Sequence, residues 1–403
     1  MHSKSIKNII ISLSLLLSGF FISTNTLGAE LSEQAQISLL TCSPGTELYS
    51  IFGHSAIWVY DPINKIDKIY NYGTFDFDTP NFYLKFIKGK LDYILARTRF
   101  KYFHYEYVVS NRSVIQQTLN LNKEQKQTLY DNLEINYLPE NRNYRYDFLF
   151  DNCATRIRDI FEKSLDYNIK YDYSIYKEEK SFRDLLDVYI YDSKWLDFGI
   201  DLALGLPADK IANPYDYMLL PDHLMNITGE ANLLQNDTLI SFSSEPKIIF
   251  RAKPTKKENY IYSPLNIFWL LFFIYLFITY YDIKKKKPTY LADKIIFGAT
   301  GLLGIVLTFL WFGTEHASMA NNLNTLWAFP FHFVIIFFIK KEKKSPFLKY
   351  YFLITAIIMG LILINWFWFP QNLHYSLFPL VLILLIRALN IFYYNTLNPQ
   401  KTL

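Results

Sequence analysis

Cysteine and close metal-binding spacings are scarce in this chain. Its 403 residues include two cysteines and seven histidines, and no HxxxH or CxxC spacing occurs. Zinc sites depend on such spacings, so we expect no metal site and no cofactor. Two cysteines are also too few to staple a domain of this size through disulfides. Any role of cysteine therefore rests on Cys42 and Cys153, as a disulfide or as free thiols.

Glycine is scarce too, with 14 residues, whereas hydrophobic residues make up 51% of the chain and aromatic residues 18%. This composition excludes a disordered or fibrous protein and suits a folded domain joined to a membrane domain. Residues 261–403 contain twelve Lys and Arg but four Asp and Glu, which leaves a net charge of −4 on residues 1–260. The basic residues lie in short clusters between hydrophobic runs. That pattern is typical of cytoplasmic loops and not of a nucleic-acid-binding surface.

The N-terminus has the order of an export signal. Two lysines precede an apolar run from Ile9 to Ile22, which is followed by small and polar residues. The run is too short to span a membrane comfortably and has the flanks of a signal peptide. We expect a signal peptide over residues 1–29, the alternative being an uncleaved anchor. In both cases residues 30–260 lie outside the cytoplasm.

Five hydrophobic runs predict a transmembrane domain over residues 261–403, because about 20 apolar residues cross a bilayer as a helix. The third run is short and contains Pro330. Lysine clusters follow the first and third runs and place those loops inside, whereas the loops at 313–324 and 370–373 have no Lys or Arg and belong outside. The runs are 262–281, 295–312, 325–339, 347–369 and 374–394.

One group of basic residues and one single arginine do not fit the pattern of cytoplasmic loops. Arg251, Lys253, Lys256 and Lys257 precede the first run on its outer side. They either attract anionic lipid headgroups or indicate an inverted topology. Arg387 lies within the fifth run, and we expect it near the cytoplasmic interface with its side chain extended toward the headgroups.

Residues 30–260 have the pattern of an α+β domain. The runs SAIWVYDP and KIDKIYNYG, joined by a short turn, predict a β-hairpin. In residues 89–100 and 112–121, apolar and polar side chains alternate, which predicts two further strands. Asn122 and Gln125 form a capping pair ahead of a helical segment. Further helices are predicted over residues 153–164, 181–191 and 195–205.

The candidate chemistry lies at Cys153 and His54. Asp151 and Asn152 are a capping pair, which predicts Cys153 in the first turn of its helix. There the helix dipole and the unpaired backbone N–H groups stabilise a thiolate and lower the pKa of the thiol. His54, at the start of the first hairpin strand, can act as general base and then as general acid. Together the two residues are the minimum for nucleophilic thiol catalysis.

The sequence leaves the roles of several residues around this pair undecided. A Cys–His pair needs a group that orients the imidazole, and the hairpin brings Tyr72 or Asn71 opposite His54. Arg156 and Arg158 would add positive potential if they faced the sulfur. A disulfide between Cys42 and Cys153 is the structural alternative, because it would consume the nucleophile.

Four longer segments of the exported region go beyond these single features: LLTCSPGTELYSIFGHSAIWVYDP, IYNYGTFDF, LPENRNYRYDFLFDNCATRIRDI and WLDFGIDLALGLPAD. The order of a histidine at a strand start and an Asn-Cys dipeptide at a helix start resembles the circularly permuted papain-like superfamily, which includes NlpC/P60 peptidases and lecithin:retinol acyltransferase. Together the four segments resemble the Lnb-type lipoprotein N-acyltransferases of Bacteroidota. The resemblance implies Cys153 as nucleophile and His54 as base.

The resemblance further implies a papain-like catalytic domain in the periplasm and a multi-pass anchor in the bacterial inner membrane. The expected reaction moves an acyl chain from a membrane phospholipid, through a Cys153 thioester, to the N-terminal amine of a diacylglyceryl-cysteine lipoprotein. The polar loop with His316 and Asn322 helps frame the site or its acceptor, or is an ordinary solvated loop. The alternatives are a Cys-His hydrolase of cell-wall peptide or phospholipid, and a non-catalytic envelope protein.

Overall fold

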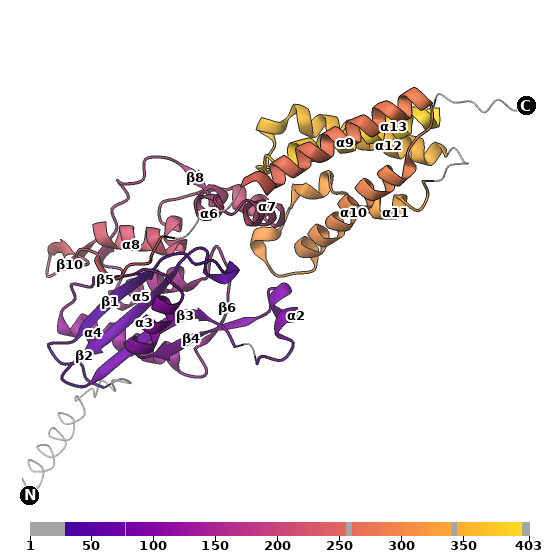
Figure 1. Ribbon diagram of the computed structural model, residues 1–403. Coiled ribbons are helices and arrows are strands. Elements are labelled where there is room, and N and C mark those ends of the chain that lie inside the picture. Colours follow the sequence, from indigo (N-terminus) through magenta and orange to yellow (C-terminus); the bar gives the residue numbers. More distant parts are fainter. Residues whose placement is uncertain (1–28, 77, 255–259, 340–344, 397–403) are drawn as a thin grey trace, which may run out of the picture.

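The computed structural model describes residues 29–76, 78–254, 260–339 and 345–396. It consists of an α+β domain followed by a bundle of apolar helices, which confirms the predicted fold class (Figure 1). The predicted signal peptide falls outside the described residues except for Ala29.

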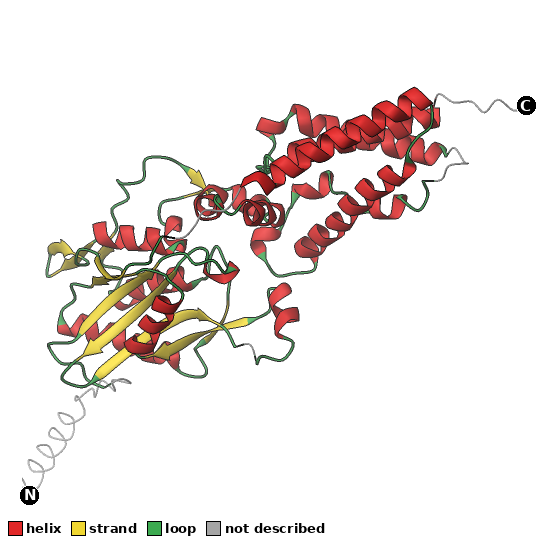
Figure 2. Ribbon diagram, viewed as in Figure 1, coloured by secondary structure: helices red, strands yellow, loops and turns green. Residues whose placement is uncertain are grey.

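A seven-stranded antiparallel sheet forms the centre of the α+β domain, in the order β12-β5-β1-β2-β3-β4-β6 (Figure 2). The predicted hairpin is present as β2 and β3, which pair from Ile57 opposite Tyr70 to Asp61 opposite Ile66. On the other side of β2, β1 places Cys42 opposite His54. The strands are β1 (Gln36–Cys42), β2 (His54–Asp61), β3 (Ile66–Thr74), β4 (Asp92–Thr98), β5 (Val114–Thr118), β6 (Asn143–Arg145) and β12 (Lys247–Phe250).

Helices cover both faces of this sheet, because alternate side chains of each strand point to opposite faces. On one face, Phe103 and Tyr107 of α3 pack on Leu40, Cys42 and Ile69. On the other face, α4, α5 and α8 form the larger core, with α5 against β2 and β3 and α8 against β1. The helices of this domain are α2 (Phe82–Ile87), α3 (Phe100–Val109), α4 (Lys123–Tyr137), α5 (Cys153–Ser164), α6 (Phe182–Ile190), α7 (Lys194–Ala203) and α8 (Pro221–Glu230).

Within the α+β domain, the predicted strands and helices are found within three residues of their expected ends. β1, α2, α3 and α8 have no counterpart among the predicted elements. In α3 the sequence FKYFHYEYVV is rich in aromatic and β-branched residues, which have low helix propensity, so tertiary packing decides its structure. Two small sheets complete the domain: β7 (Ile169–Lys170) with β10 (Asn232–Gln235) and β11 (Thr238–Ser241), and β8 (Lys180–Ser181) with β9 (Ile211–Ala212).

Four helices of the second half are long and apolar enough to cross a membrane. Two of them begin with a serine N-cap followed by proline, at Ser263 and Ser345, an order that favours helix initiation. The spans are α9 (Pro264–Lys285), α10 (Tyr290–Phe312), α12 (Pro346–Ile364) and α13 (Leu377–Thr396).

The third predicted run, 325–339, is not a continuous helix of that length. It contains α11, which covers only Phe331–Ile335 and starts directly after Pro330. The segment packs along α10, where a Cβ at Gly301 or Gly304 would lie 2.1 and 1.7 Å from backbone atoms of Phe333 and Ala328. Irregular backbone at this depth is tolerated because it is packed against protein. The lysine cluster that follows lies outside the described residues.

Arg387 does not extend toward the headgroups, so that expectation is wrong. Its side chain is fully buried and pairs with Asp293 at 2.6 Å and with Asp282 at 2.9 Å. Two carboxylates, one near the C-terminal end of α9 and one near the N-terminal end of α10, therefore compensate its charge inside the bundle. The desolvation of a buried guanidinium makes such pairing necessary.

Helix α7 and the two outer loops join the halves of the protein. Phe198 and Leu202 of α7 pack in the apolar cluster of the helical bundle. The side-chain amide of Asn322 donates to the carbonyl of Leu202 at 2.7 Å, and Gln371 donates to the carbonyl of Leu204 at 3.1 Å. These buried hydrogen bonds hold the α+β domain at the end of the bundle that carries the loops 313–324 and 370–373.

Candidate active site

The first turn of α5 presents the thiol of Cys153. Asn152 is the N-cap, and its Oδ1 accepts hydrogen bonds from the N–H groups of Ala154 at 2.9 Å and Thr155 at 3.0 Å. The Thr155 hydroxyl accepts in turn from the Asn152 N–H at 2.8 Å, and the Asn152 side chain donates to two backbone carbonyls, both at 2.9 Å. This capping box fixes Cys153 as the first residue of the helix, as the sequence predicts.

His54 opens β2, and its ring lies between Cys153 and Asn71. The Nε2 atom is hydrogen-bonded to Oδ1 of Asn71 on β3, and the ring is also hydrogen-bonded to the Cys153 thiol. Because Nε2 is hydrogen-bonded to Asn71, Nδ1 is the ring nitrogen that can bond to the sulfur. An amide that holds the distal nitrogen sets the tautomer and orientation of the imidazole, as in other Cys-His-Asn arrangements.

Of the two residues expected to orient His54, the structure places Asn71 against the ring. The Tyr72 hydroxyl instead accepts a hydrogen bond from the Asn136 side chain at 2.9 Å, in the core on the α4 side of the sheet. Successive residues of a strand point to opposite faces, so only one of the two can reach His54.

The ionisation of the pair is mutually stabilised. Burial opposes the thiolate, but the charge of His54, its hydrogen bond and the N–H groups of Ser55 and Ala154 outweigh burial and lower the pKa of Cys153 below its ordinary value. Burial likewise opposes the imidazolium, but the charge and hydrogen bond of Cys153 and the hydrogen bond of Asn71 raise the pKa of His54. Each shift is thus in the direction that favours a thiolate–imidazolium pair.

Gly73 allows the thiol to approach the sheet. It has φ +83°, in the left-handed region that favours glycine. The pairing of β3 with β4 is irregular between Asn71 and Thr74, and a Cβ on Gly73 would lie 3.5 Å from the Cβ of Cys153. This β-bulge beside the reactive sulfur is typical of a functional site. The residue lies in the IYNYGTFDF segment, but its role cannot be read without the strand register.

Tyr144 is a second residue that the sequence analysis missed. Its hydroxyl is buried and lies 3.9 Å from the position of a Cβ on Gly73. The backbone N–H of Gly73 is directed at the hydroxyl oxygen, but the hydroxyl proton has no acceptor among the described residues. Burial and the charge of Cys153 raise its pKa, so the hydroxyl stays protonated. A buried donor without a good acceptor, next to a nucleophile, is available for charge that develops during a reaction.

The two cysteines are free thiols, which excludes the disulfide alternative in this structure. Cys42 packs with Phe103 and Tyr107 on the α3 face of the sheet. Cys153 belongs to the core on the opposite face.

The charged residues around α5 do not act as the sequence suggested. Asp151 does not cap the helix but forms a two-pronged ion pair with Arg156, whose second bond measures 2.6 Å. Arg158 pairs with Asp159 at 2.7 Å. Both guanidinium groups are thereby compensated, and neither ranks among the main influences on the pKa of Cys153.

His316 and Asn322 make contacts other than with the thiol. The His316 ring is hydrogen-bonded to the carbonyl of Phe86, in the last turn of α2, at 3.2 Å. Asn322 is fully buried at the junction with α7. The loop thus contacts two elements of the α+β domain, but neither His316 nor Asn322 is hydrogen-bonded to Cys153 or His54.

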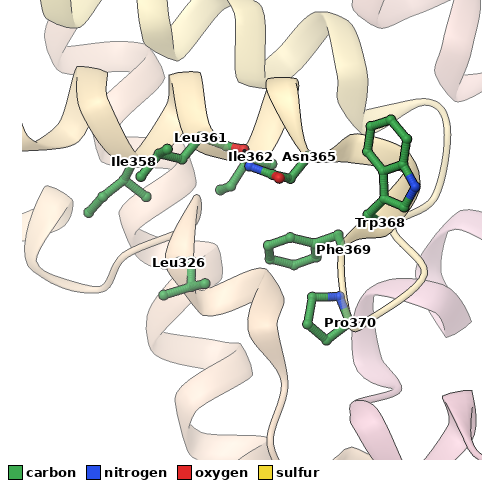
Figure 3. A pocket seen from close by; sticks show the side chains of 8 residues that line it. All are labelled: Leu326, Ile358, Leu361, Ile362, Asn365, Trp368, Phe369 and Pro370. Atoms are coloured by element: carbon green, nitrogen blue, oxygen red, sulfur yellow. Dashed lines mark hydrogen bonds between the residues drawn. The ribbon is translucent and has the colours of Figure 1, made fainter.

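Two other places have features of a binding site. Asp197, Asp201 and His374 have potential ligand atoms within 4.8 Å of one another. Asp201 already accepts from Arg183 at 2.7 Å, and Asp197 lies 3.4 Å from His374, so internal partners compensate the charges and the group does not require a metal. A mostly apolar cavity of about 390 Å³ lies in the membrane domain, away from the thiol (Figure 3). It is lined by Leu326, Ile358, Leu361, Ile362, Asn365, Trp368, Phe369 and Pro370.

Comparison with protein families accounts for both halves of the chain. Residues 29–186 match the model of the Lnb N-terminal periplasmic domain, and residues 256–398 match that of the Lnb transmembrane domain. Comparison with curated proteins and with solved structures gives no match. The two family matches together cover most of the sequence, in the order in which the structure places the α+β domain and the membrane helices. The chain therefore belongs to the Lnb family of lipoprotein N-acyltransferases and is a multi-pass membrane protein of lipoprotein biosynthesis with a periplasmic domain.

Proposed function

We propose that this protein transfers an acyl chain from a membrane phospholipid to the N-terminal amine of a diacylglyceryl-cysteine lipoprotein, through a thioester on Cys153. The observation that carries the proposal is the hydrogen-bonded Cys153–His54 pair in a domain attached to a membrane bundle. Nucleophile and base within hydrogen-bond reach, with Asn71 behind the base, are the parts that covalent acyl transfer needs.

In the first half-reaction, the Cys153 thiolate attacks the ester carbonyl of the phospholipid and forms the C–S bond. The Tyr144 hydroxyl donates to the developing oxyanion, a charge that preorganised donors stabilise strongly. When the tetrahedral intermediate collapses, the C–O bond breaks and the His54 imidazolium gives its proton to the departing alkoxide. The products are a lysophospholipid and an acyl thioester on Cys153.

In the second half-reaction, the lipoprotein amine attacks the thioester. Neutral His54 removes a proton from the amine as the C–N bond forms and the C–S bond breaks. The amide product leaves, and the thiolate–imidazolium pair is restored. The cycle balances without a metal, a nucleotide or a redox partner.

Both lipid substrates remain in a bilayer, which explains why a catalytic domain would be held at the outer end of a helical bundle. We place this bundle in the bacterial inner membrane, with residues 1–29 as signal peptide, 30–260 as the catalytic domain and 261–403 as the transmembrane domain. A cell-wall peptidase with the same Cys-His pair would need a tether and not several membrane-spanning helices.

The test uses cells depleted of their own lipoprotein N-acyltransferase. The full chain is expressed there, and the N-terminal peptide of a lipoprotein is analysed by mass spectrometry. We expect a third acyl chain with the wild type, none with Cys153→Ala, and a third chain again with Cys42→Ala, which removes the other thiol. A free amine in all strains that express stable protein would contradict the proposal and favour a hydrolase or a non-catalytic role.

A further inference from the structure

Helix α2 exposes large apolar side chains although it belongs to the α+β domain. Tyr83, Leu84, Phe86 and Ile87 are exposed by 74%, 53%, 43% and 47%. Only Phe82 of this helix is buried. Figure 1 shows α2 projecting from the sheet toward the loop that follows α10. A cluster of this kind on one short helix marks an interaction surface.

The position of α2 indicates which surface it meets. The membrane span α10 ends at Phe312, and three residues later the Glu315 N–H donates to the carbonyl of Lys88 at 2.9 Å. The Glu315 carboxylate also pairs with Lys90 at 3.2 Å. These bonds, with the His316 contact to Phe86, hold α2 at the level where a spanning helix leaves the bilayer.

The charges near α2 suit the same environment. Lys85 and Lys88 lie within and directly after the helix, among its exposed apolar side chains. Amphipathic elements that combine basic residues with aromatic and aliphatic ones lie in the headgroup region of membranes. Here the apolar side chains would enter the acyl boundary while the lysines meet phosphate groups.

A row of aromatic rings leads from α2 to the thiol. Phe86 stacks with Phe82 at 6.3 Å between ring centroids, Phe82 lies 5.7 Å from Phe75, and Phe75 lies 5.5 Å from Tyr93. Tyr93 stacks on Tyr146 at 4.3 Å.

The last ring of this row lies beside the reactive cysteine. A Cβ on Gly73 would be 3.7 Å from the Tyr146 ring and 3.5 Å from the Cβ of Cys153. Phe75, Tyr93 and Tyr146 are half-buried, so each keeps one part of its surface accessible. Phe82 is buried, so the row is a continuous series of ring contacts between α2 and the nucleophile, of which the other members are partly accessible.

We infer that α2 and this row of rings bind the fatty acyl chain of the phospholipid donor, with α2 inserted in the outer leaflet and the rings guiding the chain toward Cys153. The inference rests on the proposed function, since it names the surface by which that site receives its donor. It assigns to α2 a task in substrate delivery, whereas the Cys153–His54 pair performs the chemistry.

The first test compares two esters on the full chain in lipid nanodiscs. One is a long-chain phospholipid within the bilayer, and the other is a short-chain water-soluble aryl ester. The variant is Leu84→Ser/Phe86→Ser on α2, and the matched control is Tyr102→Ser/Tyr105→Ser, which removes exposed aromatic side chains from α3. The readout is the rate of thioester formation on Cys153, measured by intact-protein mass spectrometry.

With the phospholipid, we expect thioester formation to be about tenfold or more slower in the α2 variant than in the wild type, because two side chains no longer bury apolar area. With the soluble ester, we expect the two rates to be equal. The α3 variant should match the wild type with both. Equal rates of the α2 variant and wild type with phospholipid would overturn the inference. A loss with both esters would overturn it too, because α2 would then support the fold of the site. Absence of any thioester in the wild type would instead contradict the proposed function.

A second test needs no variant. Vesicles made with a phospholipid that carries a photoreactive diazirine at the end of one acyl chain are irradiated with the full chain, and labelled peptides are identified. We expect labels on the peptides around α2 and Tyr93 and none on α3. Labels confined to the membrane helices would contradict the inference and leave α2 as the docking surface of a protein.

Discussion

Cys42 and Cys153 are both free thiols in one domain, yet the sheet gives them opposite properties. Cys42 lies on the α3 face, where burial raises its pKa to about 12 although Arg112 and the Tyr107 hydrogen bond act against it. Cys153 lies on the α5 side, where His54 and two backbone N–H groups outweigh burial and lower its pKa. The exposed fraction hardly differs, 0% against 9%.

The comparison shows that burial alone does not decide the reactivity of a thiol. Around Cys42 the neighbours form an apolar cluster, and the thiol behaves as a small hydrophobic side chain. Around Cys153 a helix N-terminus and a histidine supply hydrogen bonds and positive charge, which a thiolate needs in a low dielectric. Strand β1 therefore holds an inert thiol, and the start of helix α5, packed against the same sheet, holds a poised one.

The largest expected effect is on alkylation of the two thiols. Iodoacetamide should modify Cys153 in the folded protein at least about a thousandfold faster than Cys42, because the attacking species is the thiolate. Peptide mapping after brief labelling at pH 7 measures both rates in one sample. The same labelling in denaturant is the control, since unfolding should remove the difference. Equal labelling rates of the two thiols in the folded protein would contradict the inferred difference in their pKa values.

The pH dependence of this labelling sharpens the comparison. Because the pKa of Cys153 is lowered, its labelling rate should stay high as the pH falls below 9 and decline only at the lowered pKa. In His54→Gln the charge partner is lost and burial prevails, so labelling at neutral pH should fall and recover only above pH 9.

A smaller effect is expected at Tyr144. Tyr144→Phe removes the proposed oxyanion donor and should lower the rate of acyl transfer by about a hundredfold, in line with the loss of one such donor in other enzymes. The thiolate is formed without this hydroxyl, so alkylation of Cys153 should remain as fast as in the wild type. Single-turnover acylation and alkylation are measured on the same preparation. A variant with unchanged acylation would show that Tyr144 has no part in the reaction.

Much of the frame around these thiols follows from local sequence. The capping pair Asp151-Asn152 predicts Cys153 in the first turn of a helix, and α5 begins at Cys153 with Asn152 as its N-cap. The alternation of apolar residues predicts the β2–β3 hairpin and the strands of the α+β domain. The catalytic roles of Cys153 and His54 stay predictions until the experiments above are done.

The remainder depended on long-range packing that one sequence does not reveal. The choice of Asn71 over Tyr72 is a matter of strand register, and a shift of one residue reverses the face. Tyr144 reaches the site from β6, about 70 positions along the chain from the β-bulge at Gly73. Arg387 could not be paired with Asp282 and Asp293 before the order of the helices was known, and the irregular segment along α10 needed its contacts with Gly301 and Gly304.

The smallest effect is expected at Asn71, which acts through His54 and is a positioning residue. Asn71→Ala should lower acyl transfer by about tenfold, the lower range for the loss of a group that orients a functional imidazole. The hydrogen bond of Asn71 raises the pKa of His54, so its removal should move the high-pH limb of the activity profile to lower pH, because the imidazolium is lost earlier. Asn71→Asp keeps an acceptor and adds negative charge, and should move that limb to higher pH. A purely structural role would lower the rate in both variants without moving the limb in opposite directions. The pH profile of single-turnover acylation therefore decides whether the reactivity of Cys153 depends on the orientation of His54 by Asn71.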